Sequence, residues 1–237
     1  MPTDICIPNG NERELIARAK AFGYNSVVFL YQNKTRGEIS QRKANLKAIS
    51  KDFQSFVGTY VIARKPIDIR KLQALYLDSD IIAVSAQDED LVRFAAESPF
   101  VDTVFEVTTT AGREHFEYRR SNFNAIIANL MKEHKQAYAL SFAHLLGFEH
   151  SVRAKVLGRE IQNIRFSRRK IPVIVASFAR FPEQIRLPDN LSAVARVLGM
   201  NAPQSKAATT SAIESILKKK EHRRSKNYIQ PGIRLVE

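Results

Sequence analysis

The stretch IPVIVASF, Ile171 to Phe178, decides the fold class. Its central residues, Val173 to Ala176, are apolar at every position, and Ile81 to Val84 repeat this pattern. A strand that is apolar on both faces is expected in a parallel sheet covered by helices on each side. The stretch therefore predicts an α/β protein built around a buried parallel sheet.

Six further runs have the same strand composition, and segments able to form helices separate them. They are TDICIP (3–8), NSVVFLY (25–31), SFVGTYVIAR (55–64), DIIAVSA (80–86), VDTVFEV (101–107) and QAYALSF (136–142). Repeated strand–helix units form either a TIM-like barrel or a doubly wound sheet. No glycine-rich fingerprint follows the first strand, as a dinucleotide-binding sheet would require, and a length of 237 residues suits a barrel. We therefore predict a TIM-like (β/α) barrel with about seven parallel strands and surrounding helices.

The composition changes near the C-terminus. Between Lys218 and Lys226 six cations stand against one acid, Glu221, and a Pro-Gly turn signal follows. Blocks of like charge repel one another and fray, so this stretch predicts a helix end that runs into a flexible arm. We therefore divide the chain into a single barrel domain, residues 1–217, and a basic C-terminal extension, residues 218–237.

The net charge indicates the kind of partner. The chain has 37 Lys and Arg against 24 Asp and Glu, a formal net charge of +13. Counterion release makes such a surface bind phosphate backbones with little sequence preference. The excess therefore predicts a nucleic-acid-binding protein, and the alternative is charge that serves only solubility.

The cellular setting follows from two other features. The single cysteine, Cys6, excludes a disulfide scaffold and a CxxC zinc site and is typical of a reducing compartment. No apolar run approaches the roughly 20 residues of a membrane span, and the N-terminus lacks the pattern of a signal peptide. We therefore expect a cytoplasmic protein without membrane contact.

Residues that could carry catalysis are few. The five histidines include no HxH pair at a strand end, and no G-x-S-x-G element is present. Asp4, Asp80, Asp102 and Glu106 lie in or beside strand runs, where acids more often cap helices or pair with arginines. We predict no catalytic residue and no metal site in this chain. The alternative is a metal-dependent phosphoesterase that uses Asp4, Glu106 and His144.

The stretch LGMNAPQSKAATTS, Leu198 to Ser211, contains a glycine and a lysine, as a phosphate-binding loop does. A P-loop requires a second glycine directly before the lysine, and this stretch has none. Gly199 is instead placed to end one helix, and Pro203 suits the first turn of the next. Lys206 lies near the start of that second helix, where its ammonium group and the unpaired backbone N–H groups could meet a phosphate.

An arginine-rich segment suits RNA. GREHFEYRRSNF (112–123) places Arg113, Arg119 and Arg120 among aromatic residues in a predicted strand–helix loop, which the barrel would present at its C-terminal rim. Guanidinium groups bind phosphates, and aromatic rings stack on exposed bases. In the alternative interpretation the rings lie in the core and the arginines pair with neighbouring glutamates.

A second basic segment, SVRAKVLGREIQNIRFSRRK (151–170), predicts a long helix. Its cations would form one strongly basic face, which could bind RNA or an acidic partner. They are Arg153, Lys155, Arg159, Arg165, Arg168, Arg169 and Lys170.

Several segments in succession carry a family resemblance. They are DLVRFAAESPFVDTV (90–104), RRSNFNAIIANLM (119–131), ALSFAHLLG (139–147), VRAKVLGREIQNIRFSRRK (152–170), IPVIVASFA (171–179), IRLPDNLSAVARVL (185–198) and GMNAPQSKAATTS (199–211). In this order they resemble the TIM-barrel protein subunit of ribonuclease P, called protein component 3 in archaea. The likeness runs from about Asp80 to Ser211 and is looser before Asp80.

The resemblance implies a function. It implies an accessory RNA-binding barrel that helps a catalytic RNA remove the 5′ leader of precursor tRNA, with Mg²⁺ serving the RNA and no cofactor bound by this chain. The implied partners are the ribonuclease P RNA, a small ferredoxin-like protein subunit and, in the holoenzyme, precursor tRNA. The family uses basic residues around the barrel. Those carried over as RNA-binding candidates are Arg64, Arg93, Arg113, Arg119, Arg120, Lys155, Arg169, Arg180 and Lys206.

The resemblance also bears on the alternatives. Phosphoesterases with a distantly similar barrel carry HxH in the first strand, whereas this chain has Asp4-Ile5-Cys6 there, so those metal ligands are missing. Besides the phosphoesterase, a generic basic RNA-binding module remains as a further alternative.

Overall fold

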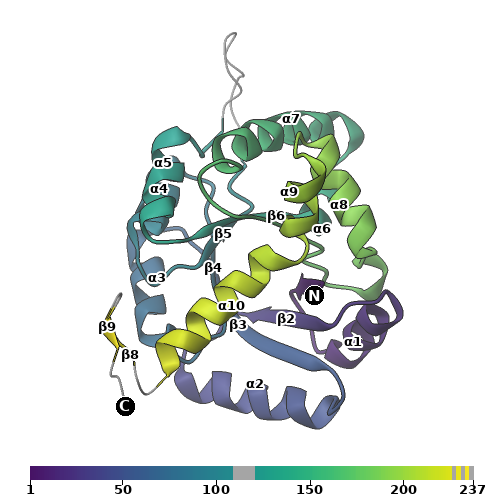
Figure 1. Cartoon of the computed structure of the whole chain (residues 1–237), viewed down its shortest axis with the longest axis vertical. Helices are drawn as coiled ribbons and strands as arrows, with labels where there is room; N and C mark the ends of the chain where they lie inside the picture. The colour runs from purple at the N-terminus through teal and green to yellow at the C-terminus, as the bar shows by residue number, and fades with distance from the viewer. Residues whose placement is uncertain (109–120, 226–227, 231–232, 235–237) are drawn as a thin grey trace.

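The strands of the computed structural model follow the predicted pattern. The structure describes residues 1–108, 121–225, 228–230 and 233–234, the last two short ranges as backbone only. Within these residues seven strands form one parallel sheet in chain order (Figure 1). They are β1 (Thr3–Cys6), β2 (Ser26–Tyr31), β3 (Gln54–Ile62), β4 (Ile82–Ser85), β5 (Thr103–Phe105), β6 (Ala137–Ser141) and β7 (Val173–Ala176). The predicted TIM-like barrel is confirmed.

Helices follow the strands and surround the sheet (Figure 1). They are α1 (Glu12–Ala21), α2 (Arg36–Ile49), α3 (Pro66–Arg70), the 3₁₀ helix η1 (Lys71–Leu75), α4 (Glu89–Glu97), α5 (Ala125–Glu133), α6 (Phe142–Leu146), α7 (His150–Ser167), the 3₁₀ helix η2 (Pro182–Gln184), α8 (Pro188–Val197), α9 (Ala202–Ala208) and α10 (Ser211–Arg224). A short antiparallel pair, β8 (Tyr228–Gln230) and β9 (Ile233–Arg234), comes last. No helix in residues 1–108 and 121–225 is both long and apolar enough to cross a membrane.

Local signals set the turn between α8 and α9. Gly199 has φ +96°, a left-handed conformation that glycine adopts readily and that ends α8. The side chain of Asn201 then accepts a hydrogen bond from the backbone N–H of Gln204 at 2.9 Å and caps α9, which has proline in its first turn. The stretch around Lys206 is therefore a turn between two helices, as predicted.

Parallel strands explain the two apolar clusters of the molecule. Val27 and Phe29 of β2 point toward the helices, and their neighbours Val28 and Leu30 point into the barrel. This alternation puts apolar side chains on both sides of each strand, which is why the strand runs are apolar throughout.

The barrel closes between β7 and β1 with little backbone pairing. Among the described residues, one isolated bridge joins Cys6 of β1 to Ala179, which lies just after β7. The carboxylate of Asp4 completes the seam, because it accepts hydrogen bonds from the Ser177 backbone N–H at 2.7 Å and from the Ser177 hydroxyl at 2.5 Å. Asp4 is fully buried, and burial raises the pKa of its carboxyl to about 6 despite these hydrogen bonds.

Helix α10 covers the end of the barrel at which the strands begin (Figure 1). Its Ile213 and Ile216 join the apolar cluster inside the barrel. Lys220 continues this buried face, and its ammonium lies 2.9 Å from the carboxylate of Asp102, which directly precedes β5. The side chains of Lys220 and Asp102 are 1% and 0% exposed, so the ion pair lies entirely inside the protein.

The predicted extension at residues 218–237 therefore needs correction in its first part. Residues 218–224 continue α10 and are held by ion pairs to the barrel, including Arg224 to Asp80 at 2.6 Å. A block of cations does not fray here because buried carboxylates on the barrel neutralise part of its charge.

Candidate nucleic-acid interface

The C-terminal ends of the strands meet at one rim of the barrel, where barrel enzymes place their sites. Arg64 follows β3 and Arg180 follows β7, and both side chains are exposed. Their backbones are fixed, because the Arg64 N–H donates to the Asp68 carboxylate at 3.1 Å and the Arg180 N–H donates to the Gln184 side-chain oxygen at 2.7 Å. Exposed guanidinium groups on such anchored turns are suited to phosphate contacts.

A cavity of about 250 Å³ opens at the same rim. Its residues come from the segments after β5, β6 and β7 and are Glu106, Ala143, His144, Gly147, Phe148, Phe178, Arg180 and Gln184. The Nδ1 atom of His144 lies 3.7 Å from a carboxylate oxygen of Glu106. Burial lowers the pKa of His144, and the nearby charge of Glu106 opposes this shift only in part.

The predicted phosphoesterase alternative needed Asp4, Glu106 and His144 in one site. The structure brings Glu106 and His144 together, but the carboxylate of Asp4 is committed to the seam with Ser177. Across the part of the chain that the structure describes, no three His, Cys, Asp or Glu side chains are grouped so that they could hold a metal ion. The geometry therefore gives this alternative no support.

The opposite end of the barrel holds a second basic group. Arg169 lies in the turn before β7 and Lys206 on α9, and both are exposed. A polar cavity of about 390 Å³ lies beside Arg169, lined also by Gly199 and Asn201. These two predicted residues therefore lie on a different face from Arg64 and Arg180.

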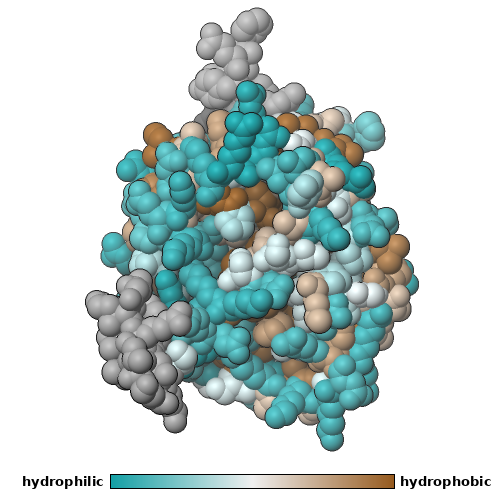
Figure 2. Space-filling model, in the orientation of Figure 1, coloured by the Kyte–Doolittle hydropathy of each residue, from teal (hydrophilic) through white to brown (hydrophobic). Residues whose placement is uncertain are grey.

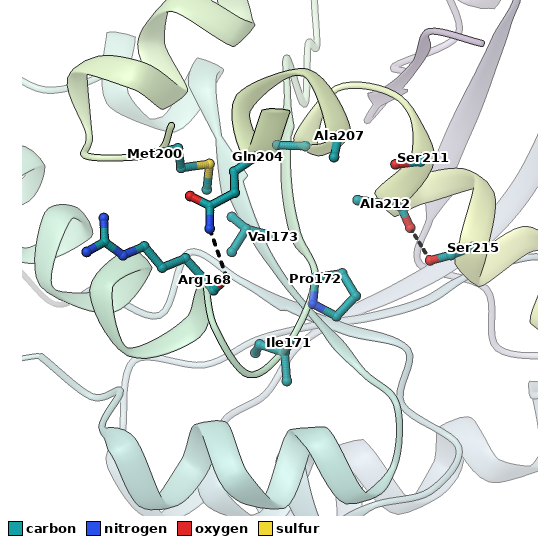
Figure 3. A pocket seen from close by; sticks show the side chains of 11 residues that line it. Arg168, Ile171, Pro172, Val173, Met200, Gln204, Ala207, Ser211, Ala212 and Ser215 are labelled. Carbon is teal, nitrogen blue, oxygen red and sulfur yellow. Dashed lines mark hydrogen bonds between the residues drawn. The ribbon is translucent and has the colours of Figure 1, made fainter. Parts of the chain in front are cut away.

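Next to this polar cavity lies an apolar one of about 380 Å³, between α7, β7, α9 and α10 (Figure 3). Met200, Val173 and Ile171 line it, and the Gln204 side-chain amide donates to the Arg168 backbone oxygen at 3.4 Å across its edge. Figure 2 shows hydrophobic residues gathered in a hollow between α7 and α10.

The remaining predicted RNA-binding residues are dispersed. Arg93 is exposed on α4 but pairs with Glu97 at 3.0 Å, and Lys155 is exposed on α7. The other three, Arg113, Arg119 and Arg120, lie outside the described residues.

The residues that flank 109–120 on either side are held by hydrogen bonds to α7. The hydroxyl of Thr108 donates to the buried carboxylate of Glu160, and the hydroxyl of Ser121 donates to Asn163 at 2.6 Å. The side chain of Asn122 also donates to the Val107 backbone oxygen at 3.0 Å, so the two ends are held close to each other.

The predicted basic face of α7 needs correction, because one of its predicted cations, Arg159, is buried. Arg159 is 1% exposed and Glu160 is 4% exposed, so this part of the helix points inward. Glu160 also accepts a hydrogen bond from the Tyr138 hydroxyl at 2.6 Å, and burial raises its pKa. The spacing of Val156, Arg159, Glu160, Asn163, Ile164 and Ser167, which are all buried, marks the inward face. Sequence interpretation missed it because most of these residues are polar.

A strongly basic TIM-like barrel with exposed arginines at its rim has the features expected of a nucleic-acid-binding barrel protein. The model of the family described as RNase P subunit p30 matches residues 1–225. The chain therefore belongs to the ribonuclease P subunit p30 family.

Relatives agree with this assignment. Ribonuclease P protein component 3 of Methanococcoides burtonii is 24% identical over 235 residues, which cover 98% of this chain and 91% of the relative. The protein of the same name from Methanothermobacter thermautotrophicus is 25% identical over 226 residues, covering 94% and 89%. A chain in a cryo-EM structure of archaeal ribonuclease P with mature tRNA superposes with a TM-score of 0.82 at 21% identity, covering 98% of both chains. This structural likeness shows that the barrel fold is shared.

Proposed function

We propose that this chain is an RNA-binding protein subunit of ribonuclease P that assists the catalytic RNA in removing the 5′ leader of precursor tRNA. The observation that carries the proposal is the family match over residues 1–225. The net charge of +13 supports it, since neutralised phosphates release counterions and draw the RNA onto the protein.

The barrel rim is the main RNA-contacting surface in this proposal. Arg64 and Arg180 are exposed on anchored turns and would hold the RNA in a fixed register. The candidates Arg93, Lys155, Arg169 and Lys206 would add weaker contacts from other faces. The undescribed Arg113, Arg119 and Arg120 remain candidates from the sequence alone.

Catalysis is assigned to the RNA. In-line cleavage of a phosphodiester needs metal ions held by several carboxylates or histidines, and exposed arginines do not supply such ligands. Mg²⁺ would therefore be bound by the RNA, and this chain would hold no cofactor of its own.

A small ferredoxin-like protein subunit is the proposed protein partner, and the cytoplasm is the proposed location. The apolar cavity beside Met200 and Val173 favours a protein contact on that face, because an apolar lining suits side chains better than phosphates. Ala207→Asp, at a partly exposed position of the same lining, should then weaken binding of the small subunit while leaving binding of the RNA unchanged.

Reconstituted cleavage tests the proposal. Precursor tRNA is incubated with the purified protein alone, with the ribonuclease P RNA alone, and with both. The proposal expects no cleavage by the protein alone and faster cleavage by the RNA when the protein is present. Cleavage by rigorously nuclease-free protein without the RNA would contradict it.

A further inference from the structure

The cavity at the C-terminal rim has a polar composition that phosphate binding does not explain. Glu106 puts a carboxylate into it, and the side chain of Glu106 is 20% exposed. A carboxylate repels a phosphate, whereas it accepts hydrogen bonds from N–H groups. The exposed Arg180 borders the same cavity, so an acceptor and a fork of donors line one small space.

His144 adds a polar atom without a partner. Its Nε2 atom is buried and has no hydrogen-bond partner among the described residues. Its Nδ1 atom is 3.7 Å from Glu106, which is longer than a hydrogen bond, so the carboxylate keeps its capacity to accept. A buried polar atom left unpaired is costly, and a ligand that reached it would remove this cost.

Aromatic rings and strained backbone complete the cavity. Phe178 lines the cavity but is 1% exposed, and its ring stacks on Phe105 at 5.0 Å between centroids, whereas His144 meets the partly buried Phe148 edge to face at 4.6 Å. Glu106 and Phe178 have φ +50° and +49°, which non-glycine residues rarely adopt. Such strain concentrates where a structure holds side chains for binding.

We propose that this cavity binds the guanine base of an unpaired RNA nucleotide. Guanine presents adjacent N1–H and N2–H donors, which match the two oxygens of Glu106, and the acceptors O6 and N7, which match the guanidinium fork of Arg180. Adenine, cytosine and uracil do not offer this combination of edges. The cavity, at about 250 Å³, is smaller than the ~300–1,000 Å³ of pockets for drug-sized ligands, which suits one ring system.

The inference rests on the proposed function, because it supplies base selectivity to an RNA-binding surface. Unpaired bases are recognised in this way, by hydrogen bonds to their edges and by contact with aromatic rings. A metal ion is a poorer occupant. Among the described residues, no third His, Cys, Asp or Glu side chain lies close enough to Glu106 and His144 to hold a metal ion with them.

Binding of two short single-stranded RNAs to the full chain tests the proposal. One probe is UUUGUUU and the other is UUUUUUU. The guanine probe should bind between about fivefold and about 150-fold more tightly, the discrimination of one bidentate base contact. The ring C–H signals of His144 in the NMR spectrum should shift with UUUGUUU and stay in place with UUUUUUU.

Two variants separate base recognition from charge. Glu106→Gln should abolish the preference for the guanine probe, because an amide cannot accept both N–H groups. Arg180→Lys keeps the charge but loses the fork, so it should reduce the preference while preserving binding of UUUUUUU. Glu97→Gln, which removes an exposed carboxylate on α4, is the matched control and should leave the preference unchanged.

The outcomes distinguish the two proposals. Equal binding of both probes, with Glu106→Gln strengthening both as any loss of negative charge would, overturns the guanine site and leaves RNA binding standing. Absence of binding to either probe and to ribonuclease P RNA overturns both. Circular dichroism of each variant shows whether the barrel is still folded.

Discussion

At the end of the barrel where the strands begin, Lys220 and Asp102 form a buried ion pair, whereas at the end where the strands finish, His144 and Glu106 line a cavity. Lys220 and Asp102 are 1% and 0% exposed at the first end. His144 and Glu106 are 21% and 20% exposed at the second, and their closest atoms are 3.7 Å apart. The first pair is closed off from solvent, whereas the second lies in a cavity that a ligand can enter.

This difference shows that some cations of this basic chain stabilise the fold, whereas others remain exposed for binding. An ion pair that is buried inside the protein cannot contact RNA, so Lys220 is a structural cation. Exposed arginines on anchored turns contribute little to stability and keep their donors for phosphates. Net charge alone does not reveal which cations belong to which group.

The largest effect is expected at the buried end. Lys220→Ala leaves the carboxylate of Asp102 buried without its closest cation and should lower the free energy of unfolding by about 3 kcal/mol. Urea unfolding measures this loss. Lys218→Ala, whose side chain is 72% exposed, is the control and should leave the unfolding midpoint in place. A stable Lys220→Ala variant would show that the α10 contacts are not structural.

A second effect lies at the seam of the barrel. Burial raises the pKa of Asp4 from 3.8 to about 6, so the folded protein binds more protons than the unfolded chain between these values. The free energy of unfolding should therefore fall as pH rises from about 4 to about 6, and Asp4→Asn should remove this contribution. Urea unfolding of both proteins at several pH values gives the difference. Parallel pH profiles would contradict the buried charge at the seam.

At the rim where the strands end, substitutions are expected to change RNA binding. Each cation removed from the RNA-contacting surface lowers the salt-dependence slope of binding by about one, so Arg64→Ala with Arg180→Ala should lower it by about two and leave the melting temperature unchanged. Arg169→Ala with Lys206→Ala, at the other end, should lower it less. An equal loss in both double variants would mean that RNA contacts both ends alike.

The smallest effect is expected on α4, at the outside of the barrel. Arg93 on α4 already pairs with Glu97 at 3.0 Å, so Arg93→Ala should change the salt-dependence slope by less than one. A larger change, measured in the same binding titration, would show that RNA breaks this pair and contacts α4.

The strands were predictable because burial on both faces makes each strand uniformly apolar, as at Val173 to Ala176. The turn at Gly199 was predictable for a different, local reason, since a positive φ favours glycine. The inward direction of the Arg159 side chain was not predictable from the sequence. A charged residue on a helix gives the same sequence pattern whether its side chain faces solvent or a buried partner.

The cavity at the C-terminal rim was harder to predict than the fold. Glu106 and His144 follow different strands, and only barrel closure brings them together with Arg180. The positive φ of Glu106 carries no sequence signal, since the residue is not a glycine. The pairing of Lys220 with Asp102 likewise joins distant parts of the chain, so the sequence indicated only a basic block there.

The Mg²⁺ dependence of precursor-tRNA cleavage tests the central claim most directly. The cleavage rate is measured against Mg²⁺ concentration for the ribonuclease P RNA alone, with this protein, with the small subunit, and with both. Because bound cations neutralise RNA phosphates, we expect the RNA with both proteins to cleave at a lower Mg²⁺ concentration than the RNA alone. An unmoved Mg²⁺ optimum would contradict the account.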